Sequence, residues 1–307
     1  MQNKKLIKSL KDLNLFINDE NVKNHEILWK HLEENITRSC AELKKLMFKI
    51  NQNGNNFVHL LVIYNKSNVI DFTINKLKRS LSKSDYQEIL KSKGQFGRNL
   101  LQLAAANSKE VKTHRILWKE LRDSCKSDDV FLEILKEVDE EGNNVFHLAA
   151  AFTTSEEFEF MISELEKLKN DKETKKVLNS FGLANKNLLQ SAAIDNKSLE
   201  TNQKIWKIIC KYFDAEEILE FIDHKTNSGN NLLCCAVNCN TKEIVEFTWN
   251  QIKSLKVTKE LQIEYLNRKG RQGKNLHQLA LENQSNDSEE AAWVQEIMKE
   301  YKIVFTK

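Results

Sequence analysis

The feature that most constrains this chain is a short phrase, Gly-x-Asn followed by a small apolar segment, which occurs six times. The copies begin at residues 54, 97, 142, 185, 229 and 273 and read GNNFVHLLV, GRNLLQLAA, GNNVFHLAA, NKNLLQSAA, GNNLLCCAV and GKNLHQLAL. They recur every 43 to 45 residues. A fixed period of this length is typical of a solenoid, because each unit buries its apolar face only against a neighbour. The sequence therefore predicts a repeat protein.

Each copy predicts a turn followed by a capped helix. Glycine, or Asn185 in the fourth copy, suits a turn residue with positive φ. Two residues later all six copies have asparagine, a strong helix N-cap. Three residues beyond the cap, even copies carry glutamine, which forms a variant of the capping box, and odd copies carry His59, His147 or Cys234. A longer amphipathic helix and a third short helix follow, so we expect three helices per repeat.

These motifs resemble the ankyrin-repeat signature D-x-x-G-x-T-P-L-H-x-A-A. The third copy matches it at Asp139, Gly142, His147, Ala149 and Ala150, and the resemblance extends over residues 50–307. No copy has the Thr-Pro pair, and each unit exceeds the 33 residues of the family by about eleven. The period alone suits HEAT or armadillo repeats better, which remain the alternative. The resemblance implies an all-α solenoid, ankyrin-like with an additional short helix per repeat.

The domain organisation follows from the repeats. We expect a single solenoid over 1–307, with a degenerate N-terminal capping repeat whose lost turn projects near Lys8. Trp29, Trp118, Trp206 and Trp293 recur at 87 to 89 residues, which indicates that two repeats form one cassette. The predicted boundaries are 1–50 for the N-terminal cap, 51–93, 94–138, 139–181, 182–225 and 226–269 for the repeats, and 270–307 for a C-terminal capping repeat.

Composition limits the classes of function. Hydrophobic residues make up 40% and charged residues 30% of the chain, and the net charge is only +3, which does not favour binding to nucleic acid. The chain has no proline, which permits helix nearly throughout. No apolar run is long enough to cross a membrane. The six cysteines form no CxxC pair, which indicates reduced thiols and a cytoplasmic protein, with the nucleus or a host cytosol as other possibilities.

No pattern of residues predicts catalysis, a cofactor or a metal. His59 and His147 are interpreted as turn scaffolding, because glutamine or cysteine replaces them in other copies. His25 and His114 precede helical segments and are expected to be solvated. His224, Cys234, Cys235 and Cys239 match no common zinc spacing. The tryptophans are expected in the core, with Trp249 the one that we expect to be more exposed.

The residues that differ from copy to copy form the candidate binding surface. After the turn residue, even copies carry a cation (Arg98, Lys186, Lys274) where odd copies carry asparagine. In an ankyrin-like stack these cations lie near the concave rim, where they can bind an acidic or phosphorylated segment; solvated turn cations are the alternative. The neighbouring candidates are Tyr64, Phe96, Phe152, Ile194 and Asp195.

The sequence thus predicts a monomeric, non-enzymatic module that binds a protein or peptide along its concave face. Two other functions remain open. One is a secreted, host-directed effector or antagonist of a symbiont, parasite or virus, which the Lys- and Asn-rich composition permits. The other is a cytosolic structural segment of a larger receptor or channel.

Overall fold

The computed structural model describes residues 21–35, 40–107, 110–282 and 289–303, and these residues are helical with no strand. The chain divides into two compact units, residues 1–140 and 141–307. The prediction of an all-α repeat protein is confirmed. The prediction that one continuous solenoid spans 1–307, with the repeat boundaries given above, stays a prediction.

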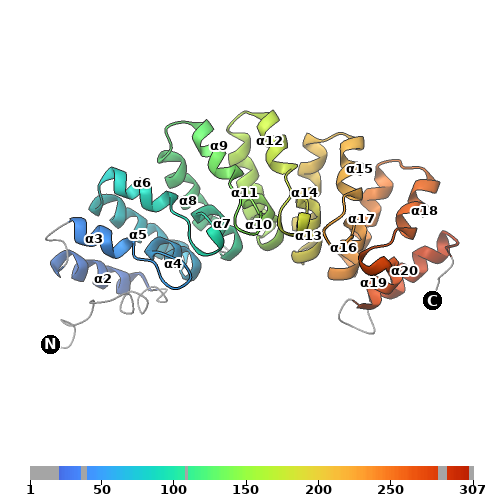
Figure 1. Cartoon of the computed structure of the whole chain (residues 1–307), viewed down its shortest axis with the longest axis horizontal. Coiled ribbons are helices and arrows are strands. Elements are labelled where there is room, and N and C mark those ends of the chain that lie inside the picture. Colours follow the sequence, from blue (N-terminus) through green and yellow to red (C-terminus); the bar gives the residue numbers. More distant parts are fainter. Residues whose placement is uncertain (1–20, 36–39, 108–109, 283–288, 304–307) are drawn as a thin grey trace. The chain divides into compact units, whose positions relative to one another are not determined.

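The first unit begins with two helices that precede the first turn motif (Figure 1). These are α2 (Val22–Asn35) and α3 (Cys40–Met47), and the projected turn near Lys8 lies outside the described residues. Two three-helix repeats follow. Their helices are α4 (Phe57–Tyr64), α5 (Ser67–Ser80), α6 (Lys83–Lys91), α7 (Leu100–Asn107), α8 (Val111–Asp123) and α9 (Asp128–Lys136). A 3₁₀ turn, η2 (Gln95–Gly97), precedes α7.

The second unit contains four repeats. The first two comprise α10 (Val145–Phe152), α11 (Ser155–Glu166), α12 (Asp171–Leu178), the 3₁₀ turn η3 (Leu183–Asn185), α13 (Leu188–Asp195), α14 (Leu199–Tyr212) and α15 (Ala215–Asp223). The last two comprise α16 (Leu232–Cys239), α17 (Lys242–Ser254), α18 (Lys259–Asn267), the 3₁₀ turn η4 (Arg271–Gly273), α19 (Leu276–Glu282) and α20 (Glu289–Glu300). The third short helix is therefore present in each of the five repeats that begin at residues 54, 97, 142, 185 and 229.

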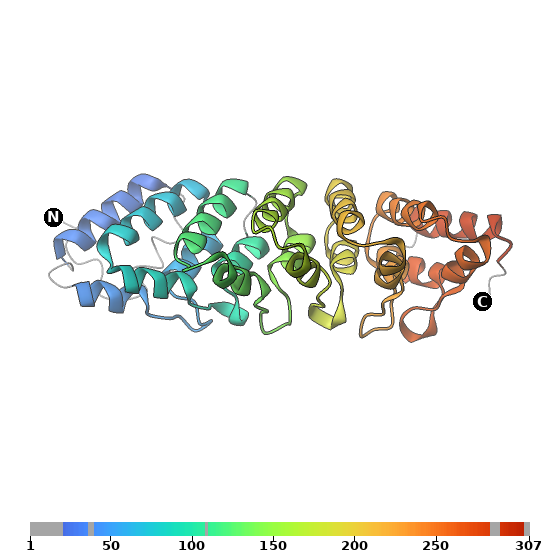
Figure 2. The same ribbon diagram turned by 90° about the horizontal axis from the view of Figure 1, so that it is seen from above.

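The helices of the second unit form two main layers. The first helices α10, α13, α16 and α19 pack side by side, and the second helices α11, α14, α17 and α20 form a parallel row against them (Figure 2). Alanine at Ala149, Ala150, Ala192 and Ala193 lets neighbouring first helices approach closely, and all four side chains are buried. The third helices lie at the edge of these layers, where α12 contacts α11 and α14.

Burial corrects three expectations about large side chains. Trp249 is fully buried rather than exposed, and the Tyr301 ring lies edge-on to it at 5.8 Å between centroids. His25 and His114 are also fully buried, not solvated. The reason is helical spacing: Leu117 and Trp118 follow His114 by three and four residues, so all three share the core face of α8. Trp29, Trp118 and Trp206 lie in the core as predicted.

Candidate functional site

The turns of all six repeats fix the start of the first helix in the same way. The five motif glycines and Asn185 have positive φ, between 59° and 87°. In the third copy the Asn144 side chain accepts the N–H groups of Phe146 and His147, at 2.9 and 3.0 Å. His147 completes the capping box, because its Nδ1 accepts the Asn144 N–H at 3.3 Å. The predicted asparagine caps and positive-φ turns are confirmed.

Histidine and glutamine perform one task at the third position of this box. His59 Nδ1 accepts the Asn56 N–H at 3.1 Å, and its Nε2 contacts the carbonyl of Ser92, after α6. In the next repeat Gln102 Oε1 accepts the Asn99 N–H at 2.9 Å, and its Nε2 donates to the carbonyl of Glu137, after α9. Each side chain therefore joins the first helix of a repeat to the end of its third helix. The interpretation of these histidines as turn scaffolding agrees with this geometry.

The alternation between asparagine and a cation after the turn residue has a structural cause. Asn143 of an odd copy accepts the Leu183 N–H of the following even copy through Oδ1, at 2.9 Å. Asn55 accepts from Gln95 and Asn230 from Arg271 in the same way, both at 2.7 Å. Each odd repeat therefore caps the 3₁₀ turn of the even repeat that follows it. This bond is the structural counterpart of the predicted two-repeat cassette.

Three glycines outside the repeat motif make this contact possible. Gly94, Gly182 and Gly270 each precede a 3₁₀ turn and have negative φ, so left-handed conformation does not explain them. A Cβ atom on Gly182 would lie 2.5 Å from Asn143 Oδ1. At Gly94 and Gly270 the same atom would lie 2.5 and 2.4 Å from Asn55 and Asn230. The sequence carried a signal for this feature, since each glycine lies three residues before the turn residue of an even copy.

The three candidate cations of the even copies each have an internal carboxylate partner. Arg98 Nε lies 2.9 Å from the fully buried Asp139, and the Arg98 guanidinium lies 5.0 Å from the centre of the Phe96 ring. Lys186 pairs with Asp195 at 2.8 Å, which brings two of the candidate residues together.

Lys274 pairs with Glu282, which also binds Arg271. These two cations lower the pKa of the Glu282 carboxyl, chiefly through hydrogen bonds to its oxygens. Sequence reasoning had no means to find these internal partners, because the paired residues lie 8 to 41 positions apart.

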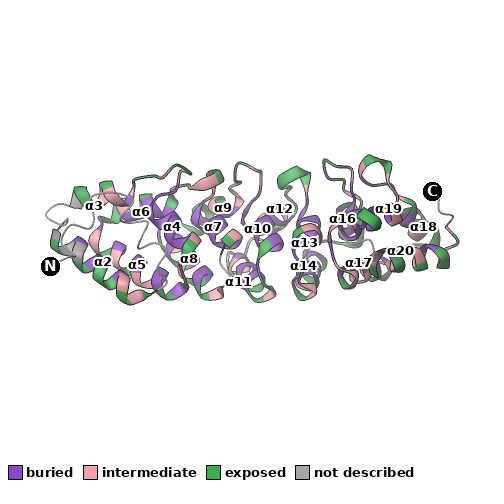
Figure 3. Cartoon of the chain, turned by 90° about the horizontal axis from the view of Figure 1, so that it is seen from below, coloured by how far each residue is buried: buried purple, intermediate pink, exposed green. Residues whose placement is uncertain are grey.

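Three of the candidate apolar residues, Tyr64, Phe152 and Ile194, lie where the first helices reach solvent, whereas Phe96 lies in the 3₁₀ turn η2. In α4, α7, α13 and α16 the first six residues are buried, and in α10 the first seven (Figure 3). The final residue of each helix is not buried, and these five residues are Tyr64, Asn107, Phe152, Asp195 and Cys239. Tyr64 and Phe152 are 52% and 41% exposed. Ile194 is half-buried, one residue before Asp195.

Buried polar bonds hold these helix ends in place in the second unit. Asn196 follows the last residue of α13, and its Nδ2 donates to the carbonyls of Ala150 and Thr153 in the preceding repeat, at 3.0 and 2.9 Å. Asn240 follows α16 and donates in the same way to the carbonyls of Ala193 and Asn196. Asp195 and Cys239, the last residues of α13 and α16, therefore each precede an asparagine that is held by two buried hydrogen bonds. Sequence reasoning missed these asparagines.

His224 and the cysteines of α16 make contacts within the fold. His224 Nε2 contacts the Asn185 carbonyl at 2.7 Å, and its ring stacks on Phe181 with centroids 4.2 Å apart. Burial raises the pKa of the Cys234 thiol to about 12 and that of Cys235 well above its ordinary value. Within the described ranges no group of three or more His, Cys, Asp or Glu side chains is arranged to hold a metal ion. No helix there is both long and apolar enough to span a membrane.

Comparison with known proteins adds two solved structures. No family model and no curated protein matches the chain. The ankyrin repeat domain of Bcl-3, a member of the IkappaB protein family, is 13% identical, with a TM-score of 0.43 over 92% of this chain and 97% of that one. A structure of a predatory endopeptidase from Bdellovibrio bacteriovorus in complex with an immunity protein contains a chain that is 14% identical, with a TM-score of 0.37 over 94% of this chain and 99% of that one.

The repeat geometry itself carries the family resemblance. A left-handed turn residue, an asparagine cap and a histidine or glutamine open a short helix, which is followed by a longer second helix, the order found in ankyrin repeats. The third helix, such as α12, lengthens each unit beyond 33 residues. The chain is an all-α repeat protein whose units resemble ankyrin repeats extended by a third helix.

Proposed function

We propose that this chain is a non-enzymatic module that binds a protein or peptide segment along the exposed ends of its first helices. One observation carries the proposal: a single structural position, the last residue of the first helix, bears Tyr64, Asn107, Phe152, Asp195 and Cys239 in successive repeats. The residues around it are fixed by caps and buried bonds. Within each unit, helix ends that present a different side chain from repeat to repeat are suited to recognition of a partner segment.

Aromatic side chains supply the main contacts in this proposal. Tyr64 in the first unit and Phe152 in the second are large and exposed, and they are anchored on rigid helices. Aromatic residues of this kind dominate the binding free energy of many protein interfaces, because they bury a large area at low entropic cost. Phe96 adds a third exposed ring, 44% accessible, above the Arg98 guanidinium.

The cations contribute orientation rather than affinity. Arg98, Lys186 and Lys274 already bind internal carboxylates, so an acidic group of the partner has to compete with Asp139, Asp195 or Glu282. Such exchange of one ion pair for another brings little net free energy. We therefore place the acidic-partner contact of this face second to its aromatic contacts.

The proposed setting follows from the thiols. Cys125, Cys210, Cys234, Cys235 and Cys239 are all free. Free thiols persist in a reducing compartment, so we propose that the protein acts in the cytoplasm. A monomeric state is a separate part of the proposal.

Photo-crosslinking tests the proposed surface in the native cell. Benzoylphenylalanine at position 64 or 152 should form a covalent adduct with the partner. The same group in place of Ile27, an exposed residue of α2 that is 58% accessible, serves as the control. Adducts from position 27 and none from positions 64 and 152 would show that the surface is misassigned.

A further inference from the structure

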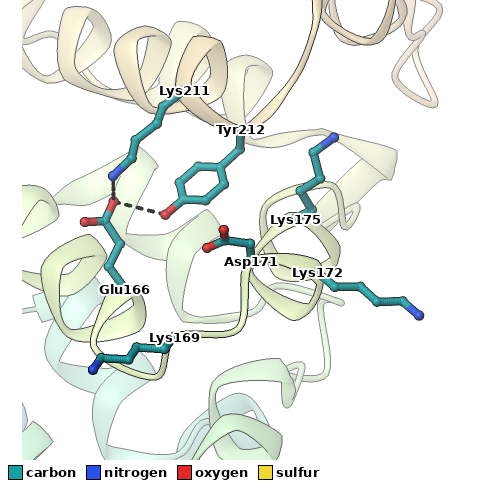
Figure 4. Close-up of a pocket in the computed structure, with 7 residues that line it drawn as sticks. All are labelled: Glu166, Lys169, Asp171, Lys172, Lys175, Lys211 and Tyr212. Atoms are coloured by element: carbon teal, nitrogen blue, oxygen red, sulfur yellow. Dashed lines mark hydrogen bonds and ion pairs between the residues drawn. The ribbon is translucent and has the colours of Figure 1, made fainter.

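The second-helix layer of the second unit carries a lysine-rich trough on α11, α12 and α14. Two adjoining cavities of about 610 and 480 Å³ form it, and both are lined by Glu166 and Lys211. Figure 4 shows the larger cavity, where Lys211 and the Tyr212 hydroxyl both contact the Glu166 carboxylate. The lysines that line the two cavities are Lys169, Lys172, Lys175, Lys204, Lys207 and Lys211.

More lysines than acids line this trough. Its six lysines are opposed by three lining acids, Glu159, Glu166 and Asp171, which leaves an excess of three positive charges. Clustered charge of one sign on a single surface attracts partners of the opposite sign and speeds their association.

Half of these lysines are free to bind a partner, unlike the cations beside the turns. Lys175 pairs with Glu217, Lys204 with Glu159 and Lys211 with Glu166, at 2.7 to 3.0 Å. The other three, Lys169, Lys172 and Lys207, are exposed and make no ion pair with any residue that the structure describes. An incoming carboxylate gains their charge without displacing an internal acid.

The directions of the Lys169 and Lys172 side chains favour an extended ligand over a small anion. In Figure 4 the Lys169 and Lys172 ammonium groups point away from each other at opposite rims of the cavity. One phosphate ion cannot contact both ammonium groups, whereas an extended chain that crosses the trough can.

The smaller cavity adds an apolar floor. Phe158, Ile162 and Ile208 line it, together with the exposed Cys210. Apolar lining between charged rims suits a peptide that alternates acidic and apolar side chains. A nucleic acid fits less well, because every nucleotide of its backbone carries a charge, whereas Phe158, Ile162 and Ile208 offer an apolar surface between the charged rims.

We propose that this trough binds an acidic segment of a partner protein, with an apolar side chain of the segment inserted between α11 and α14. The proposal rests on the proposed protein-binding function and places the acidic contact here rather than at Arg98, Lys186 and Lys274. The trough lies on the second-helix layer, so it is a surface separate from the exposed ends of the first helices.

Fluorescence anisotropy on the full chain tests this proposal with a defined probe, a labelled 20-residue peptide that alternates Glu and Leu. The trough variant is Lys169→Glu/Lys172→Glu/Lys207→Glu. Its matched control reverses three exposed lysines elsewhere in the second unit, Lys225→Glu/Lys269→Glu/Lys299→Glu, so both variants change the net charge equally. We expect the trough variant to bind at least tenfold more weakly than wild type and the control to stay within twofold. Circular dichroism melting of each variant confirms that it is folded.

Four further measurements complete the test: Cys210 alkylation, a Lys/Leu peptide, the Tyr64→Ala/Phe152→Ala variant and single-stranded DNA. Bound peptide should slow the alkylation of Cys210, followed by peptide mapping, and a Lys/Leu peptide should not bind. Tyr64→Ala/Phe152→Ala should bind the probe as wild type does. Each of three results would overturn the proposal. The first is an equal loss of affinity for the Glu/Leu peptide in the trough variant and in its control. The others are no binding of this peptide to wild type, and tighter binding of single-stranded DNA of equal charge. The crosslinking at positions 64 and 152 tests the proposed function separately from these results.

Discussion

Asn143 Oδ1 accepts the backbone N–H of Leu183 at 2.9 Å, which joins an odd repeat to the even repeat that follows it. The bond requires Gly182, because a Cβ atom there would lie 2.5 Å from the same oxygen. The arrangement recurs twice more, at Asn55 with Gly94 and at Asn230 with Gly270. Repeats in this chain are therefore coupled in pairs.

The first prediction concerns this coupling. Gly182→Ala should lower the free energy of unfolding by about 1–3 kcal/mol, because the new methyl group overlaps the Asn143 side chain. Asn143→Ala should lower the free energy of unfolding by about 1–3 kcal/mol, because it leaves the partly buried Leu183 N–H without this acceptor. The double variant should lose less free energy of unfolding than the two single variants together, by about 1 kcal/mol or more. The reason is that removal of the Asn143 side chain also removes its overlap with the new methyl group. Urea denaturation of the four proteins measures the coupling.

Gly142→Ala is the control for this cycle. Gly142 has a φ of 84°, and a Cβ atom there meets nothing closer than 3.8 Å. Its substitution should cost about 1–2 kcal/mol through left-handed strain alone. Strict additivity of Gly182→Ala and Asn143→Ala would contradict the steric explanation.

The second prediction uses the strained middle residue of the 3₁₀ turn. Ala184 has a φ of 56°, and Asn185 beside it has a φ of 59°. Ala184→Gly relieves about 1–2 kcal/mol of strain that the left-handed conformation imposes on alanine in the folded state. Glycine also stabilises the unfolded state by about 0.5–1 kcal/mol, because it has more conformational entropy there. The variant should therefore be more stable by roughly 0.5–1 kcal/mol, measured as a rise in the urea midpoint. A lower midpoint at unchanged slope would show that the turn is not strained.

The third prediction concerns pH. Burial lowers the pKa of His59 from 6.5 to about 4 in the folded protein, because the fully buried ring cannot readily accept a charge. Above pH 6.5 the ring is neutral in both states, and its contribution to stability is complete. As the pH falls from 6.5 towards 4, the unfolded chain takes up a proton that the folded chain does not. Wild type should lose up to about 3 kcal/mol in this window at 1.36 kcal/mol per pH unit.

His59→Gln separates this effect from the titration of carboxylates. Glutamine occupies the same position in the next repeat, where Gln102 makes the same two bonds. The variant should differ from wild type by less than about 1 kcal/mol at pH 7.5. It should be the more stable of the two at pH 4.5, since Gln does not titrate. Parallel stability curves for the two proteins between pH 7.5 and 4.5 would rule out His59 as the titrating group.

Residue types and their periodicity predicted most of the fold, but they did not predict the contacts between repeats. The turn glycines, the asparagine caps and the third helices follow from residue types and periodicity, because these features depend on near neighbours in the chain. The prediction that His25 and His114 are solvated was wrong. Leu28 and Leu117 follow them by three residues, and this spacing indicates that the histidines share the buried face of their helices. We expected Trp249 to be more exposed because it breaks the pattern of tryptophans in even copies. That expectation was wrong, because its burial depends on the core face of its own helix.

The candidate surface was predictable only in part. Exposed residues such as Tyr64 and Phe152 follow from their place at the end of a short helix. The ion pair between Arg98 and Asp139 does not, because it depends on the packing of successive turns. The trough on α11, α12 and α14 also requires the structure, since its lysines come from α12, from α14 and from the segment between α11 and α12.

The most direct test of the account compares partner capture by wild type, by Tyr64→Ala/Phe152→Ala and by a matched control, Ile27→Ala/Val130→Ala, which also removes two exposed apolar side chains. The binding partner recovered with wild type from the native cell is titrated against each purified protein. Removal of the two aromatic anchors should weaken binding at least tenfold at unchanged melting temperature, while the control stays within twofold. Equal affinity of wild type and Tyr64→Ala/Phe152→Ala for that partner would contradict the assignment of the first-helix ends as the binding surface.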